Sequence, residues 1–226
     1  MDAISPYDLR PWVGQYGSHI KAELTPPAAL GLLMLSGPLT ALIFGYGEFT
    51  ARDVEMSSYA LMAYSLGLMG FSLVKVLAPG YFARQDTRTP VRIGVIALAS
   101  NMAFNLAVVL PAHLAGFFAP HALLALSTGL SACLNSLLLY RGLRRSGVYQ
   151  PSAHWRRLWP RVLAAGAGMA GFLWWSAGDW SAWTSMPPAA RALNGALCVA
   201  GGAAVYFALL LATGVRQADF RSGPAR

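Results

Sequence analysis

The polar side chains that could do chemistry inside the long apolar stretches of this sequence are few. Lys75 is a lone cation in one stretch, Asn101 and Asn105 stand four positions apart in a second, and Asn135 lies in a third. Side chains four positions apart share one face of a helix. An ammonium group could attract an anionic substrate, whereas asparagine side chains could join helices by hydrogen bonds. The sequence therefore predicts anion binding or helix packing at these positions.

The patterns that hydrolases, redox enzymes and metalloenzymes need are missing from the sequence. It has no HExxH, GxSxG or P-loop motif and no pair of acids within an apolar stretch. The two cysteines lie in apolar runs without CxxC spacing, so neither a disulfide framework nor a zinc site is predicted. We therefore expect a protein that is not an enzyme, with no catalytic residue, metal or cofactor.

Six apolar stretches, each about 20 residues long, must position these groups. They cover roughly residues 26–46, 56–80, 91–112, 117–140, 159–178 and 191–213. A helix of about 20 residues crosses a hydrocarbon core of about 30 Å. Of the 226 residues 56% are hydrophobic and 12% are charged, whereas a soluble domain has about 25% charged residues. The sequence predicts an all-α polytopic membrane protein with six transmembrane helices.

The residues that carry the net charge of +8 lie mainly in the short connections between these stretches and near the termini. With six spans, all lysines and arginines except Lys75, Arg52 and Arg191 fall on the side of the two termini. Positive residues mark the cytoplasmic side of a membrane protein. Both termini are therefore predicted to be cytoplasmic. Because no contiguous basic soluble surface is predicted, nucleic-acid binding is not expected.

Proline and small residues suggest how the stretches pack. Pro38 interrupts the first stretch, where it could be a packing kink or a hinge. The fifth and sixth stretches are rich in glycine and alanine. Small residues allow two helices to pack tightly, or leave a shallow groove that could take a lipid. The sequence leaves both alternatives open.

One long motif carries a family resemblance. It runs from Lys75 to Pro90 with the sequence KVLAPGYFARQDTRTP, and shorter matches are LSGPL at 35–39, FGYGEFT at 44–50 and GLSACLN at 129–135. The chain resembles the MurJ/MviN family of lipid II flippases from about residue 25 to its carboxyl terminus. The resemblance implies the carboxyl-terminal part of a two-lobed, fourteen-helix transporter of the MOP superfamily, which is MATE-like.

The function implied by the resemblance is alternating-access transport in the bacterial cytoplasmic (inner) membrane. The substrate would be lipid II, the undecaprenyl-diphosphate-linked peptidoglycan precursor. Further partners would be membrane lipids and a missing amino-terminal portion of the transporter, which would hold the main substrate-binding arginines. The implied organisation is a polar cytoplasmic leader (1–24), a four-helix part of the second lobe (25–141), a cytoplasmic basic loop (142–158), a carboxyl-terminal helix pair (159–214) and a cytoplasmic tail (215–226).

Three cations are the candidates for substrate contact. Lys75, Arg84 and Arg88 would meet anionic headgroups near the cytoplasmic mouth, since a guanidinium group suits bidentate phosphate contact. Alternatively, Lys75 reaches the headgroup layer along its own stem, and the two arginines only set the topology. A different function, a stand-alone six-span structural or scaffolding protein, remains the alternative to transport.

Overall fold

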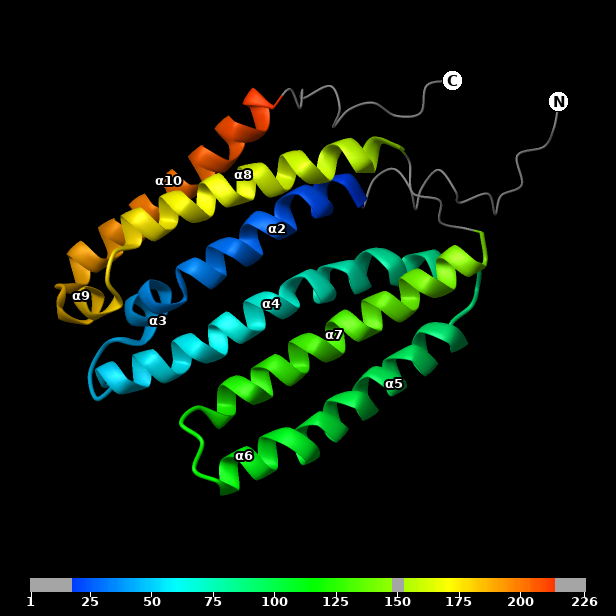
Figure 1. Cartoon of the computed structure of the whole chain (residues 1–226), viewed down its shortest axis with the longest axis horizontal. Coiled ribbons are helices and arrows are strands. Elements are labelled where there is room, and N and C mark those ends of the chain that lie inside the picture. The colour runs from blue at the N-terminus through cyan, green and yellow to red at the C-terminus, as the bar shows by residue number, and fades with distance from the viewer. Residues whose placement is uncertain (1–17, 148–152, 214–226) are drawn as a thin grey trace.

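The computed structural model describes residues 18–147 and 153–213, and the regular elements of these ranges are all helical (Figure 1). The predicted leader up to residue 17 and the tail from residue 214 lie outside the described residues. The helices are α2 (Ser18–Met34), α3 (Ser36–Phe44), α4 (Ala51–Phe82), α5 (Arg88–Phe104), the π-helical turn η1 (Asn105–Val109), α6 (Leu110–Leu114), α7 (Pro120–Arg145), α8 (Ala153–Ala177), α9 (Trp180–Ser185) and α10 (Pro188–Ala212).

The helices form two groups that meet at α2 and α3. On one side α7 lies between α4 and α5, and on the other side α8 packs on α10 (Figure 1). Helix α2 contacts both α4 and α8, so it joins the two groups. The short helix α9 packs against α3.

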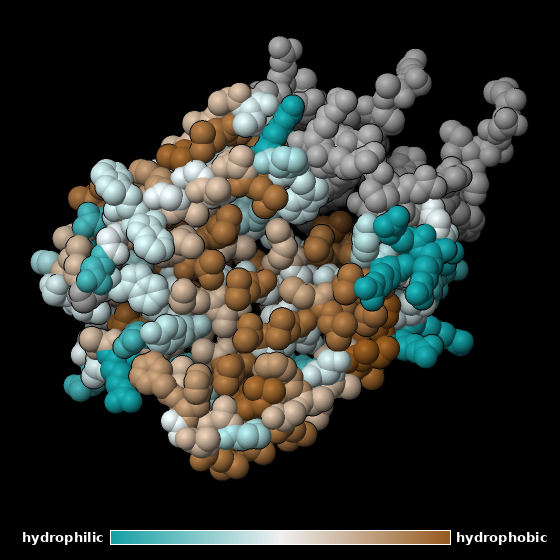
Figure 2. Space-filling view, in the orientation of Figure 1, coloured by the Kyte–Doolittle hydropathy of each residue, from teal (hydrophilic) through white to brown (hydrophobic). Residues whose placement is uncertain are grey.

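Much of the surface is apolar, as a membrane protein requires. Figure 2 shows hydrophobic side chains spread over the middle of the visible face, with hydrophilic groups gathered near the ends. Among the described residues, four helices are long and apolar enough to cross a membrane: α4, α5 with its continuation to Leu114, α7 and α10. The bent pair α2–α3 makes a fifth if it is counted as one span. Helix α8 is as long as α10, but its tryptophans and arginines lower its hydropathy, and a sixth span stays a prediction.

The bend between α2 and α3 is 71° and follows from the residues at the junction. Leu35 leaves the helical region of backbone space, with φ −96° and ψ 12°. Pro38 has no N–H to donate to the carbonyl of Met34, and its ring presses on that turn. Gly37 lies so close to the indole of Trp180 that a Cβ there would collide with the ring. The chain therefore bends where the sequence places Pro38.

Glycines let α4 and α7 run side by side along their full length. Gly67 of α4 meets Gly129 of α7, and Gly70 meets Cys133. The residue numbers rise together on both helices, so the two helices are parallel. A Cβ on Gly67 would overlap the Cα of Gly129, and one on Gly70 would lie 2.6 Å from the backbone nitrogen of Cys133. Close approach of two backbones replaces the hydrophobic driving force that helices lack within lipid.

The small residues of α8 and α10 receive large side chains from the partner helix. A Cβ on Gly168 would collide with Leu209, and a Cβ on Gly202 would lie 2.9 Å from Leu173. Gly171, by contrast, has open space around the position of its absent Cβ. The glycine-rich and alanine-rich stretches were expected either to pack tightly or to leave a shallow groove. At Gly168 and Gly202 the contacts are those of tight packing.

Helical backbone extends into two of the segments expected from sequence to be connections. Helix α2 begins at Ser18, within the expected leader 1–24. Helix α7 continues to Arg145 and α8 starts at Ala153, so most of the expected loop 142–158 that the structure describes is helical. Apolar stretches mark where a helix is in the membrane, and polar turns of the same helix can extend beyond it.

Candidate functional site

The three candidate cations lie at or near the turn between α4 and α5. Lys75 is exposed on α4, less than two turns before that helix reaches Phe82. Arg84 is exposed in the turn itself, and Arg88 is exposed as the first residue of α5. The structure therefore brings Arg84 and Arg88 together on one turn, with Lys75 further along α4.

The turn holds these arginines through a defined backbone motif. Gln85 adopts the left-handed conformation with φ 57°, which is uncommon for a residue with a side chain. The Gln85 N–H donates to the carbonyl of Phe82 at 2.9 Å, and the Asp86 N–H donates to that of Tyr81 at 3.1 Å. This pair of hydrogen bonds is a Schellman motif, which satisfies the last carbonyls of a helix. Helix α4 is thus terminated by hydrogen bonding at the centre of the family motif.

Asp86 then starts the next helix. Its carboxylate accepts a hydrogen bond from the Thr89 backbone N–H at 3.0 Å. That hydrogen bond, the Thr89 hydroxyl and the nearby Arg84 guanidinium hold the pKa of Asp86 below its usual value of 3.8. A carboxylate at a helix amino terminus also opposes the positive end of the helix dipole.

Loss of the Asp86 charge is expected to loosen the first turn of α5. Because the pKa is lower in the folded state, Asp86 stabilises the fold above pH 3.8, and this contribution is lost as the pH falls through the lower folded value. The protection factor of the Thr89 amide, which is its exchange rate relative to an unfolded amide at the same pH, should therefore fall on acidification, and D86N, which cannot titrate, should remove this acid-dependent step. Equal acid sensitivity in D86N would contradict the assignment.

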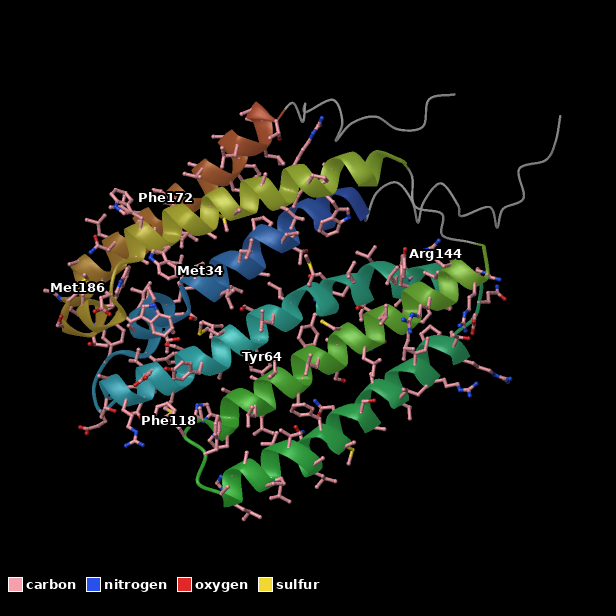
Figure 3. The ribbon with its side chains drawn as sticks, in the orientation of Figure 1. Met34, Tyr64, Phe118, Arg144, Phe172 and Met186 are labelled. Atoms are coloured by element: carbon pink, nitrogen blue, oxygen red, sulfur yellow. The ribbon has the colours of Figure 1, made fainter. Side chains whose placement is uncertain are left out.

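Six exposed arginines gather where α4 ends, α5 begins and α7 ends, and we call this the basic end. They are Arg84, Arg88, Arg92, Arg141, Arg144 and Arg145. Beneath them, buried residues of all three helices form one apolar cluster that includes Tyr81, Ile93 and Leu143. Arg144, labelled in Figure 3, lies with its Cζ 5.9 Å from the centre of the Tyr140 ring. Exposed arginines at this density attract phosphate groups.

Asn101 and Asn105 take part in a hydrogen-bond network between α5 and α7. The Asn101 amide donates to the Ser127 hydroxyl at 3.2 Å, and that hydroxyl lies 2.6 Å from Oδ1 of Asn105. The Asn105 amide donates to Oδ1 of Asn101 at 3.2 Å. One turn along, the Ser131 hydroxyl donates to the Ala97 carbonyl at 2.6 Å. The four-residue spacing indicates the shared face, but the serine partners could not be identified from sequence.

Asn135 stands apart from this network. Its Oδ1 is buried and has no hydrogen-bond partner among the described residues.

The network of Asn101, Asn105 and Ser127 borders the π-helical turn η1, which begins at Asn105 and lies between α5 and α6. Such turns often occur at functional sites.

Removing the Ser127 hydroxyl is expected to weaken the contact of α5 with α7. We expect S127A to lower the free energy of unfolding by about 0.5 to 2 kcal/mol, the range found for interhelical hydrogen bonds in membranes. The matched control is T128A, since the Thr128 hydroxyl bonds only the Leu124 carbonyl of its own helix, at 3.0 Å. Equilibrium unfolding of both variants in mixed detergent micelles measures the difference, and equal losses would refute a bridging role.

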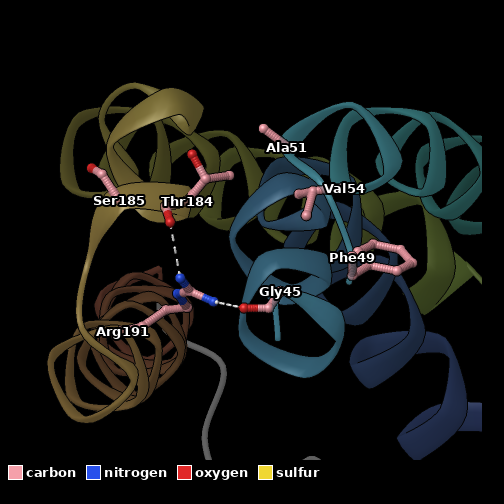
Figure 4. A pocket seen from close by; sticks show the side chains of 7 residues that line it. All are labelled: Gly45, Phe49, Ala51, Val54, Thr184, Ser185 and Arg191. Atoms are coloured by element: carbon pink, nitrogen blue, oxygen red, sulfur yellow. Dashed lines mark hydrogen bonds between the residues drawn. The ribbon is translucent and has the colours of Figure 1, made fainter. Parts of the chain in front are cut away.

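Arg191 is the one charged side chain that is buried in the part of the chain that the structure describes, with 4% of its surface exposed. One terminal nitrogen, Nη1, donates to the carbonyls of Ala41 at 2.7 Å and Gly45 at 2.8 Å. The other, Nη2, donates to those of Thr184 and Met186, each at 3.1 Å. Figure 4 shows the bonds to Gly45 and Thr184. The guanidinium thus joins the carboxyl-terminal ends of α3 and α9.

A cavity of about 300 Å³ lies beside this guanidinium. It is lined by Gly45, Phe49, Ala51, Val54, Thr184, Ser185 and Arg191 (Figure 4). Both terminal nitrogens of Arg191 are already bonded to carbonyls, and its Nε is buried without a partner among the described residues. The side chain therefore serves as a helix-end cation and leaves little donor capacity for an anion in the cavity.

No sequence pattern indicates this role of Arg191. Arg191 stands at the edge of the sixth apolar stretch, where an exposed arginine would look the same. Its acceptors are backbone atoms, which no side-chain motif marks. In the described part of the chain, no three of the side chains of His, Cys, Asp and Glu are grouped as a metal ion would need.

Comparison with known proteins places these features in a family. The family described as "Lipid II flippase MurJ" matches residues 15–190. A protein of Vibrio cholerae named "Probable lipid II flippase MurJ" is 44% identical over 209 residues, which cover 92% of this chain and 38% of that protein. The "Lipid II flippase MurJ" of Burkholderia cenocepacia is 41% identical over 208 residues, covering 91% of this chain and 39% of its own length.

The matched region includes the turn between α4 and α5, the polar network and Arg191's acceptors on α3 and α9. This chain spans less than two fifths of the length of these relatives. Because the family match covers most of the chain and the identity extends over nine tenths of it, the relationship does not depend on one motif. The chain is a multi-pass membrane protein and belongs to the MurJ lipid II flippase family.

Proposed function

We propose that this chain is the carboxyl-terminal portion of a lipid II flippase. The supporting observation is the 44% identity to the Vibrio cholerae relative over 92% of this chain, which includes α4, α5, α7 and the basic end. In this proposal the complete transporter moves undecaprenyl-diphosphate-linked precursor across the bacterial cytoplasmic membrane by alternating access of two lobes. The chain supplies six spans of that MATE-like fold, and both of its termini are cytoplasmic.

The proposed substrate contacts are Lys75, Arg84 and Arg88. All three side chains are exposed, and the two arginines are held on one structured turn. The diphosphate of the substrate carries the charge that such cations bind, and guanidinium groups bind phosphate oxygens in pairs. Lys75 lies deeper along α4, where a bound headgroup would meet it after passing the arginines.

A chimera tests whether the chain works in transport. This chain would replace the 209 residues that it matches in the Vibrio cholerae relative, and the chimera would be expressed in cells depleted of their own flippase. We expect growth to be rescued and labelled lipid II to reach the outer leaflet. A chimera that inserts at the normal level and moves no lipid II would refute the proposal.

Variants of Lys75 within the chimera test its contact with substrate. We expect K75A to slow the appearance of lipid II outside the cell about tenfold, because hydrogen bonds to charged groups contribute about 1.5 to 3 kcal/mol. K75R should restore most of the rate by keeping the charge. The matched control is F71A, which alters an exposed uncharged residue one turn away on α4. Full transport by K75A would remove Lys75 from the mechanism.

A further inference from the structure

We propose that Arg191 is the positioning residue that sets the angle between α2 and α3 and fixes it to the carboxyl-terminal helix pair. This inference concerns the mechanics of the fold and does not depend on the proposed transport function. It rests on the four backbone carbonyls around one guanidinium, on the bend in the α2–α3 span and on the cavity beside α3.

The guanidinium holds both sides of the joint. On one side, Ala41 and Gly45 supply the last carbonyls of α3, where the negative end of a helix dipole faces a cation. On the other side, Thr184 and Met186 belong to α9 and the turn that leads into α10. The ring of Tyr46 covers the cation, with its centre 5.7 Å from Cζ. One side chain thus hydrogen-bonds the carboxyl end of α3 both to α9 and to the turn that follows α9.

The bend between α2 and α3 explains why the contact of Arg191 with α3 can set the angle between these helices. Pro38 removes a hydrogen bond of the helix at the junction, and Leu35 is outside helical geometry, so the helical hydrogen-bond pattern is interrupted there. Gly45, Phe49 and Val54 border the cavity, which leaves space next to the end of α3. The start of α3 is buried and packed under Trp180, so it serves as a fixed point, and the direction of α3 then depends on what binds its far end beside the cavity. Pro38, expected from sequence to be a kink or a hinge, is in this proposal the pivot.

Packing is the competing explanation of the bend angle. Trp180 covers Gly37 near the pivot, and Leu42 lies 3.2 Å from the Cβ position of Gly195 on α10. If these contacts alone set the angle, removing the donors of Arg191 would leave α3 in place. If Arg191 sets the angle, α3 becomes free to swing about the pivot.

Distance measurement between spin labels on α2 and α3 separates the two explanations. The full chain in lipid nanodiscs carries labels at A28C and I43C, in a background in which the native cysteines are replaced by C133S and C198A; Ala28 and Ile43 are both exposed. A swing of about 20° moves the end of the nine-residue α3 by about 5 Å, which pulsed electron spin resonance resolves. We expect R191M to broaden or shift this distance by about that amount.

Controls show whether the change belongs to the joint. T40V removes a buried hydrogen bond within α3, the 2.7 Å bond from the Thr40 hydroxyl to Ser36, without touching α10, and should leave the distance unchanged. A label pair at L66C on α4 and L98C on α5, both exposed positions, should not respond to R191M. An unchanged α2–α3 distance in folded R191M would overturn the proposal.

A second variant decides the question if R191M does not fold. In G45A the new methyl group would meet Nη1 of Arg191 and the carbonyl of Ala41, so it separates the guanidinium from α3 while the charge is kept. The backbone of Gly45 has a φ of −72°, which alanine also adopts, so the substitution acts through these two contacts and not through a forbidden φ. We expect the same broadening as in R191M, and an unchanged distance in G45A would refute the positioning role.

Discussion

Replacing Gly67 with leucine is expected to separate α4 from α7 and to lower the free energy of unfolding by about 3 kcal/mol or more. A Cβ on Gly67 would already overlap the Cα of Gly129, and the further side-chain atoms would fall on the same backbone. Backbone cannot move aside as a flexible side chain does. The two helices must therefore part along the contact that is the most extensive in the structure.

The matched control for G67L is G94L. Gly94 also lies within a helix, in α5, but a Cβ there would have no atom within 4 Å. We expect G94L to change stability by no more than about 0.5 kcal/mol, as surface substitutions do. Unfolding of both variants in detergent by increasing fractions of SDS, followed by circular dichroism, measures the difference. A loss in G94L as large as that in G67L would show that any large side chain added to these helices is destabilising, and that the α4–α7 contact is not specifically responsible.

The positions of the helices could be predicted from sequence because hydropathy is a local property. The stretches 56–80 and 117–140 fall inside or largely inside α4 and α7, and the structure extends the first of them by a turn or so at its start. Helix boundaries depend on capping groups, which are short-range but compete with one another. Asp86 caps α5 from outside the helix by accepting a hydrogen bond from the Thr89 N–H.

Contacts between segments far apart in the chain could not be predicted in the same way. Small residues were noted in the fifth and sixth stretches, yet the closest backbone approach involves Gly67 and Gly129, on the second and fourth. A single glycine in an apolar run is common, and only the register of two helices shows that two glycines meet. The pair Asn101 and Asn105 was predictable as one face of a helix, whereas its bridging partner Ser127 depends on how α7 is rotated.

Arg191 was the residue least open to prediction, because its environment consists of backbone. Its acceptors are at positions 41, 45, 184 and 186, so they come from two ends of the chain. Lys75 is a different case: its charge inside an apolar stretch was expected to reach the headgroup layer or a bound anion, and the structure places it on an exposed face. Burial of a charge depends on which helices surround it, and hydropathy does not contain that information.

Replacing Arg191 with methionine is expected to lower the free energy of unfolding by about 3 to 5 kcal/mol, because four backbone carbonyls lose a charged hydrogen-bond donor at once. The methionine keeps the apolar stem but leaves the carbonyls of Ala41, Gly45, Thr184 and Met186 without this donor. Each buried acceptor that loses its partner costs about 1 to 3 kcal/mol. The loss is partly offset because the unpartnered Nε and the desolvated charge disappear together.

The control for R191M is R52M, because Arg52 is an arginine exposed to solvent near the start of α4. We expect R52M to change stability by about 0.5 kcal/mol or less. R191K adds a second comparison, since one ammonium group cannot reach four carbonyls that surround a planar guanidinium, and it should recover only part of the loss. Unfolding by SDS measures all three variants under the same conditions. If R191M were as stable as the unaltered chain, the apolar packing of Trp180 on Gly37 and of Leu42 on Gly195 would be sufficient to hold α3.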